Sequence, residues 1–366
     1  MGNAVIRIGA LITRGDLPKK ENDLNVSANS LLLHMAGSYG IELFLFSPED
    51  VNLEKNTISG LFIEYGKLVK REVPIPFIVD NKTIALPTDE WMVNFFDTFK
   101  MRTHFTRNMV YFAKMGQYNR ITKFFKNKGF VDVAIPTLEV QKETDPMQLV
   151  EKLGDDIILK PDNSSRGRGI FGIKRQAERF LIIKDDAAAL DMSIPELKSY
   201  IDELLSSKKY IAQKRVYSMT PSGRPFDIRV LVQRRNKDSY EYIMYPRIGG
   251  GKILSNIAAG GSTMPIDSFL TENFSEEAPE IKKMLEYFAM NFPPYYQKFL
   301  KHPFFDLGFD VGIEKIDKSY KLWVFEINQG PQFAFKYNLA ELHMKIARAT
   351  LECYRYLYSE LENVKS

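Results

Sequence analysis

The sequence predicts a mixed α/β (α+β) protein with two domains. Its 366 residues are enough for two domains or for one large enzyme with a cleft. A strand, a helix and a second strand open the chain, which is typical of an α/β unit with parallel strands. Several hairpins follow, which indicates antiparallel sheet. We therefore expect a small α/β domain over residues 1–100 and a larger, hairpin-rich domain over residues 101–366.

The composition is that of an ordinary soluble protein, with 45% hydrophobic and 26% charged residues. A net charge of +4 is too balanced to indicate a nucleic-acid partner, and none is expected. Cys353 is the single cysteine, so no intrachain disulfide can form, and the four histidines lack zinc-ligand spacing. The apolar stretch near the N-terminus is too short and interrupted for a membrane span or signal peptide. We expect a cytoplasmic protein that does not bind membranes.

The first domain is expected to hold two strands joined by a helix, and then a hairpin. "AVIRIGALI" (4–12) reads as a buried strand and "IELFLFS" (41–47) as a second. The stretch 27–40 between them has helical apolar spacing and ends on Gly40. Residues 59–76 predict a hairpin with its turn near Gly66.

The second domain is expected to alternate helices and hairpins. Helix is predicted over 88–129, 184–208, 275–300 and 338–362. Strands are predicted over 155–160, 170–175 and 209–216, and hairpins are predicted over 226–248 and 307–328.

One strand of the last hairpin, "KLWVFEIN" (321–328), carries Glu326 and Asn328 among apolar residues. Side chains two apart share a face of a strand, and a carboxylate beside a carboxamide oxygen suits a hard cation. A turn near Asp317–Ser319 places Asp310 opposite Glu326 or one of its neighbours, and the register decides which. In the favourable register Asp310, Glu326 and Asn328 converge and could hold magnesium. A polar, solvated strand face is the alternative.

A second polar stretch, "LKPDNSSRGRG" (159–169), follows a buried strand that ends in Lys160. Gly167 and Gly169 allow the backbone to approach a phosphate closely. The loop leads into a strand and not a helix, so it is neither a P-loop nor a dinucleotide-binding fingerprint. Two arginines and a lysine favour anion binding, and a mobile hairpin tip is the alternative.

A third stretch, "PFDIRVLVQ" (225–233), places Asp227 and Arg229 on one strand face. An arginine held by a neighbouring aspartate stays charged and oriented, which suits stabilisation of a transferring phosphoryl group. Arg247 lies on the returning strand, and Asn256 comes in a weaker glycine-containing stretch. A structural ion pair on a half-exposed strand is the alternative.

In their order and approximate spacing, Lys160 with its loop, "FDIRV", "SNIAAGG" and "GFDVGIE…FEINQGP" resemble the ATP-grasp superfamily. The regions before Lys160 are most similar to the spore coat-associated YheC/YheD-type branch. The resemblance implies an ATP-grasp fold with an N-terminal pre-ATP-grasp domain. It further implies an ATP lid subdomain near residues 130–216 and a magnesium and catalytic subdomain near residues 217–366.

The resemblance also implies roles for individual residues. Those that would bind ATP are two lysines, a lid loop and an adenine hinge: Lys114 and Lys160; Ser164, Ser165, Arg166, Gly167 and Gly169; Gln213, Lys214, Arg215 and Val216. Those that would act on the γ-phosphate or lie near the phosphates are Arg229, Arg247 and Asn256. Asp310, Glu326 and Asn328 would hold one or two magnesium ions.

Two positions depart from the pattern of the relatives. Lys214 stands where many relatives carry a glutamate, and Ala259 stands where related ligases often carry an arginine. Both departures leave nucleotide selectivity and acceptor handling open.

The function implied is a magnesium- and ATP-dependent ligase that joins a carboxylate to an amine through an acyl phosphate and releases ADP and phosphate. Such a reaction needs positioning and charge neutralisation but no covalent nucleophile. Its substrates would be small-molecule or peptide carboxylates and amines. The alternatives are an ATP-grasp kinase and a non-catalytic, ATP-binding protein associated with the spore coat.

Overall fold

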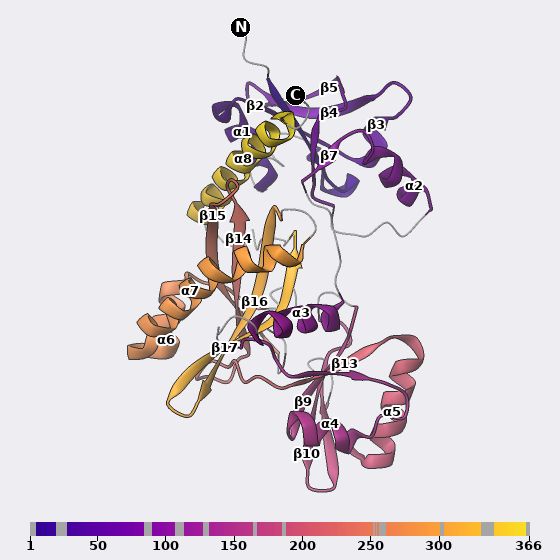
Figure 1. Ribbon diagram of the computed structural model, residues 1–366, viewed down its shortest axis with the longest axis vertical. Helices are drawn as coiled ribbons and strands as arrows, with labels where there is room; N and C mark the ends of the chain where they lie inside the picture. The colour runs from indigo at the N-terminus through magenta and orange to yellow at the C-terminus, as the bar shows by residue number, and fades with distance from the viewer. Residues whose placement is uncertain are drawn as a thin grey trace.

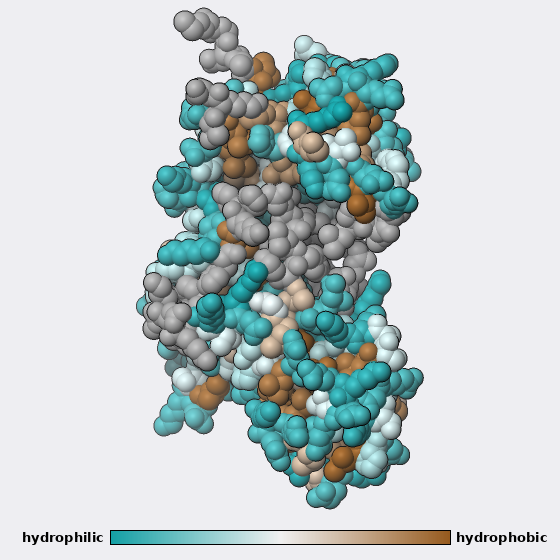
Figure 2. Space-filling model, turned by 45° about the vertical axis from the view of Figure 1, so that its right-hand side comes forward, coloured by the Kyte–Doolittle hydropathy of each residue, from teal (hydrophilic) through white to brown (hydrophobic). Residues whose placement is uncertain are grey.

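The structure is a computed structural model that describes residues 5–19, 28–83, 90–106, 113–126, 132–163, 167–184, 188–251, 253, 255, 261–300, 304–330 and 340–363. Within these residues the chain forms three β-sheets, which follow one another along the long axis of the molecule (Figure 1). None of the described helices is both long and apolar enough to cross a membrane. On the face shown in Figure 2, hydrophilic side chains cover most of the described surface, and hydrophobic ones form separate small patches.

The N-terminal sheet has a parallel centre with an antiparallel edge. Strand β1 pairs in parallel with both β2 and β6, and β4 and β5 form the predicted hairpin, which extends the sheet beyond β2. Gly66 lies in the hairpin turn with a φ of 78°, which favours glycine. The strands are β1 Ile6–Leu11, β2 Ile41–Phe46, β3 Val51–Asn52, β4 Thr57–Glu64, β5 Lys67–Pro74, β6 Ile78–Asn81 and β7 His104–Phe105, and the helices are α1 Ala28–Ala36 and α2 Glu90–Phe99.

The second sheet, which we call the lid sheet, is antiparallel throughout and has helices on one face only. Helices α4 (Pro146–Leu153) and α5 (Ile194–Ser207) cover that face and share its apolar core. Ser193 and Glu196 form a capping box that starts α5. The opposite face carries Lys160 and Gln213. The strands are β8 Thr137–Val140, β9 Asp156–Pro161, β10 Phe171–Gln176, β11 Arg179–Ile183, β12 Leu190–Ser193 and β13 Tyr210–Lys214.

The third sheet, which we call the central sheet, is antiparallel in the order β15-β14-β16-β17. Its strands are β14 Phe226–Arg234, β15 Tyr240–Ile248, β16 Asp306–Ile316 and β17 Ser319–Gln329. Alternate apolar side chains such as Val230, Phe309 and Val324 form the largest core with α6 (Ile266–Phe274) and α7 (Ala278–Tyr296). Helix α3 (Lys114–Lys126) contacts both β17 and the lid-sheet strand β8.

The closing helix α8 (Ala340–Asn363) runs from the central sheet to the N-terminal sheet (Figure 1). Its Ile346 packs against β14 and β15, and its Leu351 and Tyr354 pack in the core of the N-terminal sheet. Strand β7 also joins that sheet from beyond residue 100. The division at residue 100 remains a prediction.

Two of the expected helices differ from the structure. Of the stretch 88–129, the described part contains α2 and α3 separated by the short strand β7, because His104 and Phe105 pair with the edge of β6. The helix expected from residue 184 begins only at Ile194. The residues before it form β12, which pairs with β11, and the capping box fixes the helix start.

Candidate active site

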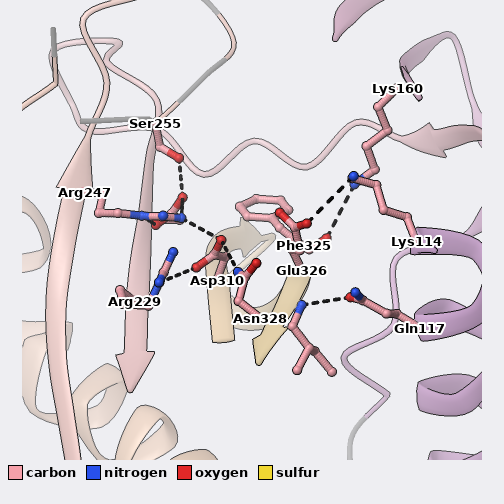
Figure 3. A network of polar contacts seen from close by, with 12 residues as sticks. Lys114, Gln117, Lys160, Arg229, Arg247, Ser255, Asp310, Phe325, Glu326 and Asn328 are labelled. Carbon is pink, nitrogen blue, oxygen red and sulfur yellow. Dashed lines mark hydrogen bonds and ion pairs between the residues drawn. The ribbon is translucent and has the colours of Figure 1, made fainter. Parts of the chain in front are cut away.

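The register of the β16–β17 hairpin brings the three predicted metal ligands to one place. Asp310 pairs with Glu326, and Asn328 pairs with Gly308. The side chains of Asp310, Glu326 and Asn328 lie together between the central sheet and the lid sheet (Figure 3), and Asn328 Nδ2 donates to Asp310 Oδ2 at 3.3 Å. The favourable register is therefore the observed one.

A β-bulge lies within this register. Asp310 pairs with Glu326 but the next residue, Val311, pairs with Val324, so Phe325 is the extra residue. The Phe325 ring lies over Gly312, where a Cβ would come within 2.4 Å of the ring. The bulge thus turns Phe325 to the same face as Asp310. Glycine inside a strand is a signal of such close approach, and it was present at Gly312.

Two arginines hold Asp310. Arg229 Nε lies 2.6 Å from Asp310 Oδ1, and Arg247 Nη2 lies 2.9 Å from Asp310 Oδ2. Burial opposes ionisation, but the two guanidinium groups outweigh it and lower the pKa of Asp310. Both arginines are thereby held in fixed orientations beside Asp310, where their N–H groups could bind an anion.

The aspartate beside Arg229 in the sequence has a different partner from the expected one. Asp227 accepts two hydrogen bonds of 2.7 Å from Arg247, and Ser255 Oγ also donates to it. Asp227 and Arg247 are cross-strand partners, whereas Arg229 pairs across the ladder with Asp310. Burial raises the pKa of Asp227, although Arg247 opposes that effect. The expectation that Asp227 holds Arg229 is wrong, because each pairs across the sheet with another residue. The alternative of a half-exposed strand is also wrong, because every residue of β14 is buried.

The two predicted nucleotide lysines meet at β17. Lys160 Nζ donates to the carbonyl oxygen of Phe325 at 3.4 Å, and Lys114 Nζ lies 3.8 Å from Glu326 Oε1. Asp162 directly follows β9, the strand of Lys160, and links it to α3, the helix of Lys114. Its Oδ1 accepts the Met115 N–H at the start of α3. Burial lowers the pKa of Lys160 to about 8, with Lys114 adding to the effect and Glu326 and Asp310 opposing it.

Gln117 is a site residue that the sequence reasoning missed. It lies one turn after Lys114 on α3, and its Oε1 accepts the Ile327 N–H at 2.9 Å (Figure 3). The spacing of three residues, which puts Gln117 on the same helix face as Lys114, was the available signal.

The predicted adenine hinge lies at the end of β13. The N–H groups of Lys214 and Arg215 donate to Pro136 and Asp156 within the lid sheet. Gln213 donates to Thr137, and Val216, which is half-buried, follows the end of the strand. Lys214 Nζ lies 3.9 Å from Glu314 Oε2. Glu314, a buried residue the sequence reasoning also missed, accepts the Tyr217 N–H and so fastens the hinge to β16.

The predicted phosphate loop is described only in part. Gly167 and Gly169 have φ values of 74° and 76°, a region that favours glycine. A Cβ on Gly169 would lie 3.0 Å from the Pro161 ring, so this position also needs glycine for space. Ser164, Ser165, Arg166 and Asn256 lie outside the described residues.

The donor chemistry of the site fits a magnesium ion bound together with a polyphosphate. Magnesium in such sites takes one or two carboxylates and completes its shell with water and phosphate oxygens. In the described part of the chain, no cluster of three or more His, Cys, Asp or Glu side chains offers a metal a complete protein cage. Asp310 and Glu326 provide two carboxylates and Asn328 a carboxamide, and Glu326 remains 29% exposed. Four buried or half-buried basic side chains surround these three residues, and their positive charges would suit the phosphates of such a complex.

Comparison with solved structures shows the fold of the chain. The whole chain resembles the crystal structure of N5-carboxyaminoimidazole synthetase from Staphylococcus aureus, with a TM-score of 0.52 and 12% identity over 94% of this chain and 77% of that one. The fold of this chain is the ATP-grasp fold.

Comparison of sequences identifies the family to which the chain belongs among proteins with the ATP-grasp fold. Residues 102–357 match the family described as YheC/D like ATP-grasp, so the chain belongs to that family. A curated relative is the endospore coat-associated protein YheD of Bacillus subtilis (strain 168), which is 24% identical over 330 residues, 86% of this chain and 69% of that protein.

Proposed function

We propose that the protein is an ATP-dependent ligase that joins a carboxylate to an amine through an acyl phosphate. One observation carries the proposal: Asp310, Glu326 and Asn328 share a face that Lys114, Lys160, Arg229 and Arg247 surround. Two carboxylates and a carboxamide among buried cations suit a magnesium–polyphosphate complex better than any substrate without phosphates.

The residues would divide the nucleotide between them. Lys114 and Lys160 would bind the α- and β-phosphates, under the loop that contains Gly167 and Gly169. Arg229 and Arg247 would neutralise the γ-phosphoryl group as it transfers. The base would lie against the hinge at Gln213–Val216, with Phe325 as its apolar floor. Asp310, Glu326 and Asn328 would hold magnesium, which supplies charge neutralisation on the phosphates.

The reaction proceeds in two steps. A substrate carboxylate oxygen attacks the γ-phosphorus, the bond to the bridging oxygen breaks, and ADP leaves with that electron pair. An amine then attacks the acyl carbon, phosphate leaves, and the ammonium proton passes to solvent. Arg229 and Arg247 would stabilise the charge in both steps, and the hydrogen bonds by which Asp310 and Asp227 fix their orientation support this role.

A second candidate is a non-catalytic, ATP-binding protein of the spore coat. The relative YheD of Bacillus subtilis is an endospore coat-associated protein, which favours this candidate. On that reading the same residues bind the nucleotide but no acceptor reacts. An ATP-grasp kinase, which would transfer the γ-phosphoryl group to a hydroxyl, is a third outcome for the same scaffold.

The test is phosphorus NMR of the protein with magnesium-ATP and a small-molecule and peptide fraction from bacterial cytosol. We expect ADP and phosphate that depend on the fraction, together with a new amide in mass spectra of the same sample. The matched control is Glu326→Gln, which should lose turnover and keep the fold. A new phosphoester resonance would instead identify a kinase. Unchanged ATP with several independent fractions would favour the non-catalytic protein.

A further inference from the structure

Strand β17 carries two of the proposed metal ligands but lies at the edge of its sheet. It pairs with β16 on one side and makes only an isolated bridge, Ala134 with Val324, on the other among the described residues, so most N–H and C=O groups on that side need partners from elsewhere. In the described structure three separate segments supply them. Val133 O accepts the Val324 N–H at 2.9 Å, Lys160 Nζ donates to Phe325 O at 3.4 Å, and Gln117 Oε1 accepts the Ile327 N–H at 2.9 Å.

The contact of Gln117 is the one that falls between the ligands. Ile327 separates Glu326 from Asn328, so a hydrogen bond to its N–H fixes the backbone that carries both side chains. Gln117 is 8% exposed, and the bond therefore forms in a place where water competes little for the donor.

The local geometry makes this support necessary. The bulge at Phe325 interrupts the ladder directly before Glu326, and only three more residues of β17 follow. A bulge bends its strand and releases one residue from pairing, so the side-chain directions beyond it depend on other contacts. Gln117 supplies one of them from the same face of α3 that sends Lys114 to Glu326.

We propose that Gln117 is a positioning residue: its side-chain carbonyl sets the backbone between Glu326 and Asn328 and so prepares both for the cation. The inference rests on the proposed function, because it assumes that this strand binds magnesium with a nucleotide. Gln117 touches neither the nucleotide nor the metal in this account. It acts through Ile327.

Two variants separate the hydrogen bond from simple packing. Gln117→Met keeps the length of the side chain and removes the acceptor, whereas Gln117→Glu keeps an acceptor. Gln148→Met, at an exposed position on α4, is the matched control for loss of an amide. Two quantities are measured in each full-length protein: hydrogen exchange at the Ile327 amide, and the Kd for ADP with magnesium and with EDTA.

In Gln117→Met we expect Ile327 to exchange about tenfold faster, since one buried hydrogen bond is lost. The tightening of ADP binding by magnesium should fall about tenfold, the size of effect seen when a residue that orients a metal ligand is removed. ADP binding in EDTA should change less than about twofold. Gln117→Glu should keep slow exchange and most of the magnesium effect, and Gln148→Met should behave as the wild type.

Each other outcome overturns the inference in a recognisable way. Faster exchange with an unchanged magnesium effect would show a hydrogen bond that serves packing alone. Unchanged exchange would show that Gln117 does not hold Ile327. If magnesium does not change the Kd for ADP of the wild type, the proposed function is wrong. The positioning role is then wrong too, whatever the exchange rates are.

Discussion

At the scale of single residues, the site is defined by how its charges are paired. Asp310 is shared between Arg229 and Arg247, Asp227 holds Arg247 from the other side, and Glu326 faces Lys114. Lys160 donates to a neutral carbonyl group and brings its charge close to Lys114. These groups contain four cations and three carboxylates, so the arrangement favours an incoming anion.

Lys160 gives a pH dependence whose sign follows from its burial. Its pKa of about 8 means that the free protein loses this charge as the pH rises from 7 to 9. Phosphate groups favour the ammonium form, so binding above pH 8 must take up a proton. We expect the Kd for ADP with magnesium to rise about tenfold between pH 7 and pH 9, as measured by calorimetry. Lys160→Met should bind weakly at both pH values, and an equal slope in that variant would assign the effect to another group.

At the scale of elements, the hairpin β16–β17 decides the geometry of the site. The turn near Asp317 restricts its register so far that Asp310 must lie opposite Glu326 or one of its neighbours, and the structure selects Glu326. The bulge could not be predicted, because it depends on the Phe325 ring finding space over Gly312. The spacing from Lys114 places Gln117 on the same helix face, but its partner could not be predicted, because that partner is a backbone group 210 residues away.

The Gly312–Phe325 contact can be tested with a pair of glycine variants. Gly312→Ala would place a Cβ against the Phe325 ring, so we expect a loss of about 1–3 kcal/mol in the free energy of unfolding. Gly116→Ala in α3 meets open space and should stabilise the protein by about 0.5–1 kcal/mol. Urea denaturation measures both. Equal effects in the two variants would mean that Phe325 does not occupy the place described.

The ion-pair network shows a second limit of prediction from sequence. Neighbours on one strand, Asp227 and Arg229, were expected to pair, but each found its partner on an adjacent strand. Cross-strand side chains approach more closely than residues two apart along a strand. The candidate residues were therefore predictable, whereas their partners required the sheet order.

At the scale of the whole molecule, α8 joins the central sheet to the N-terminal sheet. Gln233 donates to Thr350 on α8, and the Tyr354 hydroxyl donates to Asp80 at the end of β6. Asp80 is fully buried and also accepts from Thr106 at 2.7 Å. The sequence predicts α8 as a closing helix, but its apolar residues do not reveal that it packs against two sheets.

Removing one of these links should weaken the whole molecule. Tyr354→Phe leaves the buried Asp80 with one donor fewer, so we expect a loss of about 1–3 kcal/mol in the free energy of unfolding. The control is Tyr358→Phe on the same helix, at a half-buried position, which should cost less than about 0.5 kcal/mol. Thermal unfolding provides the comparison. If the two variants unfold alike, the Tyr354–Asp80 hydrogen bond does not stabilise the attachment of α8 to the N-terminal sheet.

The central claim is that Asp310, Glu326 and Asn328 bind magnesium together with a nucleotide. Calorimetric titration of ADP, with magnesium and with EDTA, tests it most directly in the wild type and in Glu326→Gln. We predict that magnesium tightens ADP binding at least about tenfold in the wild type and has little effect in Glu326→Gln, because one carboxylate ligand is lost. Equal tightening in both proteins would contradict the account.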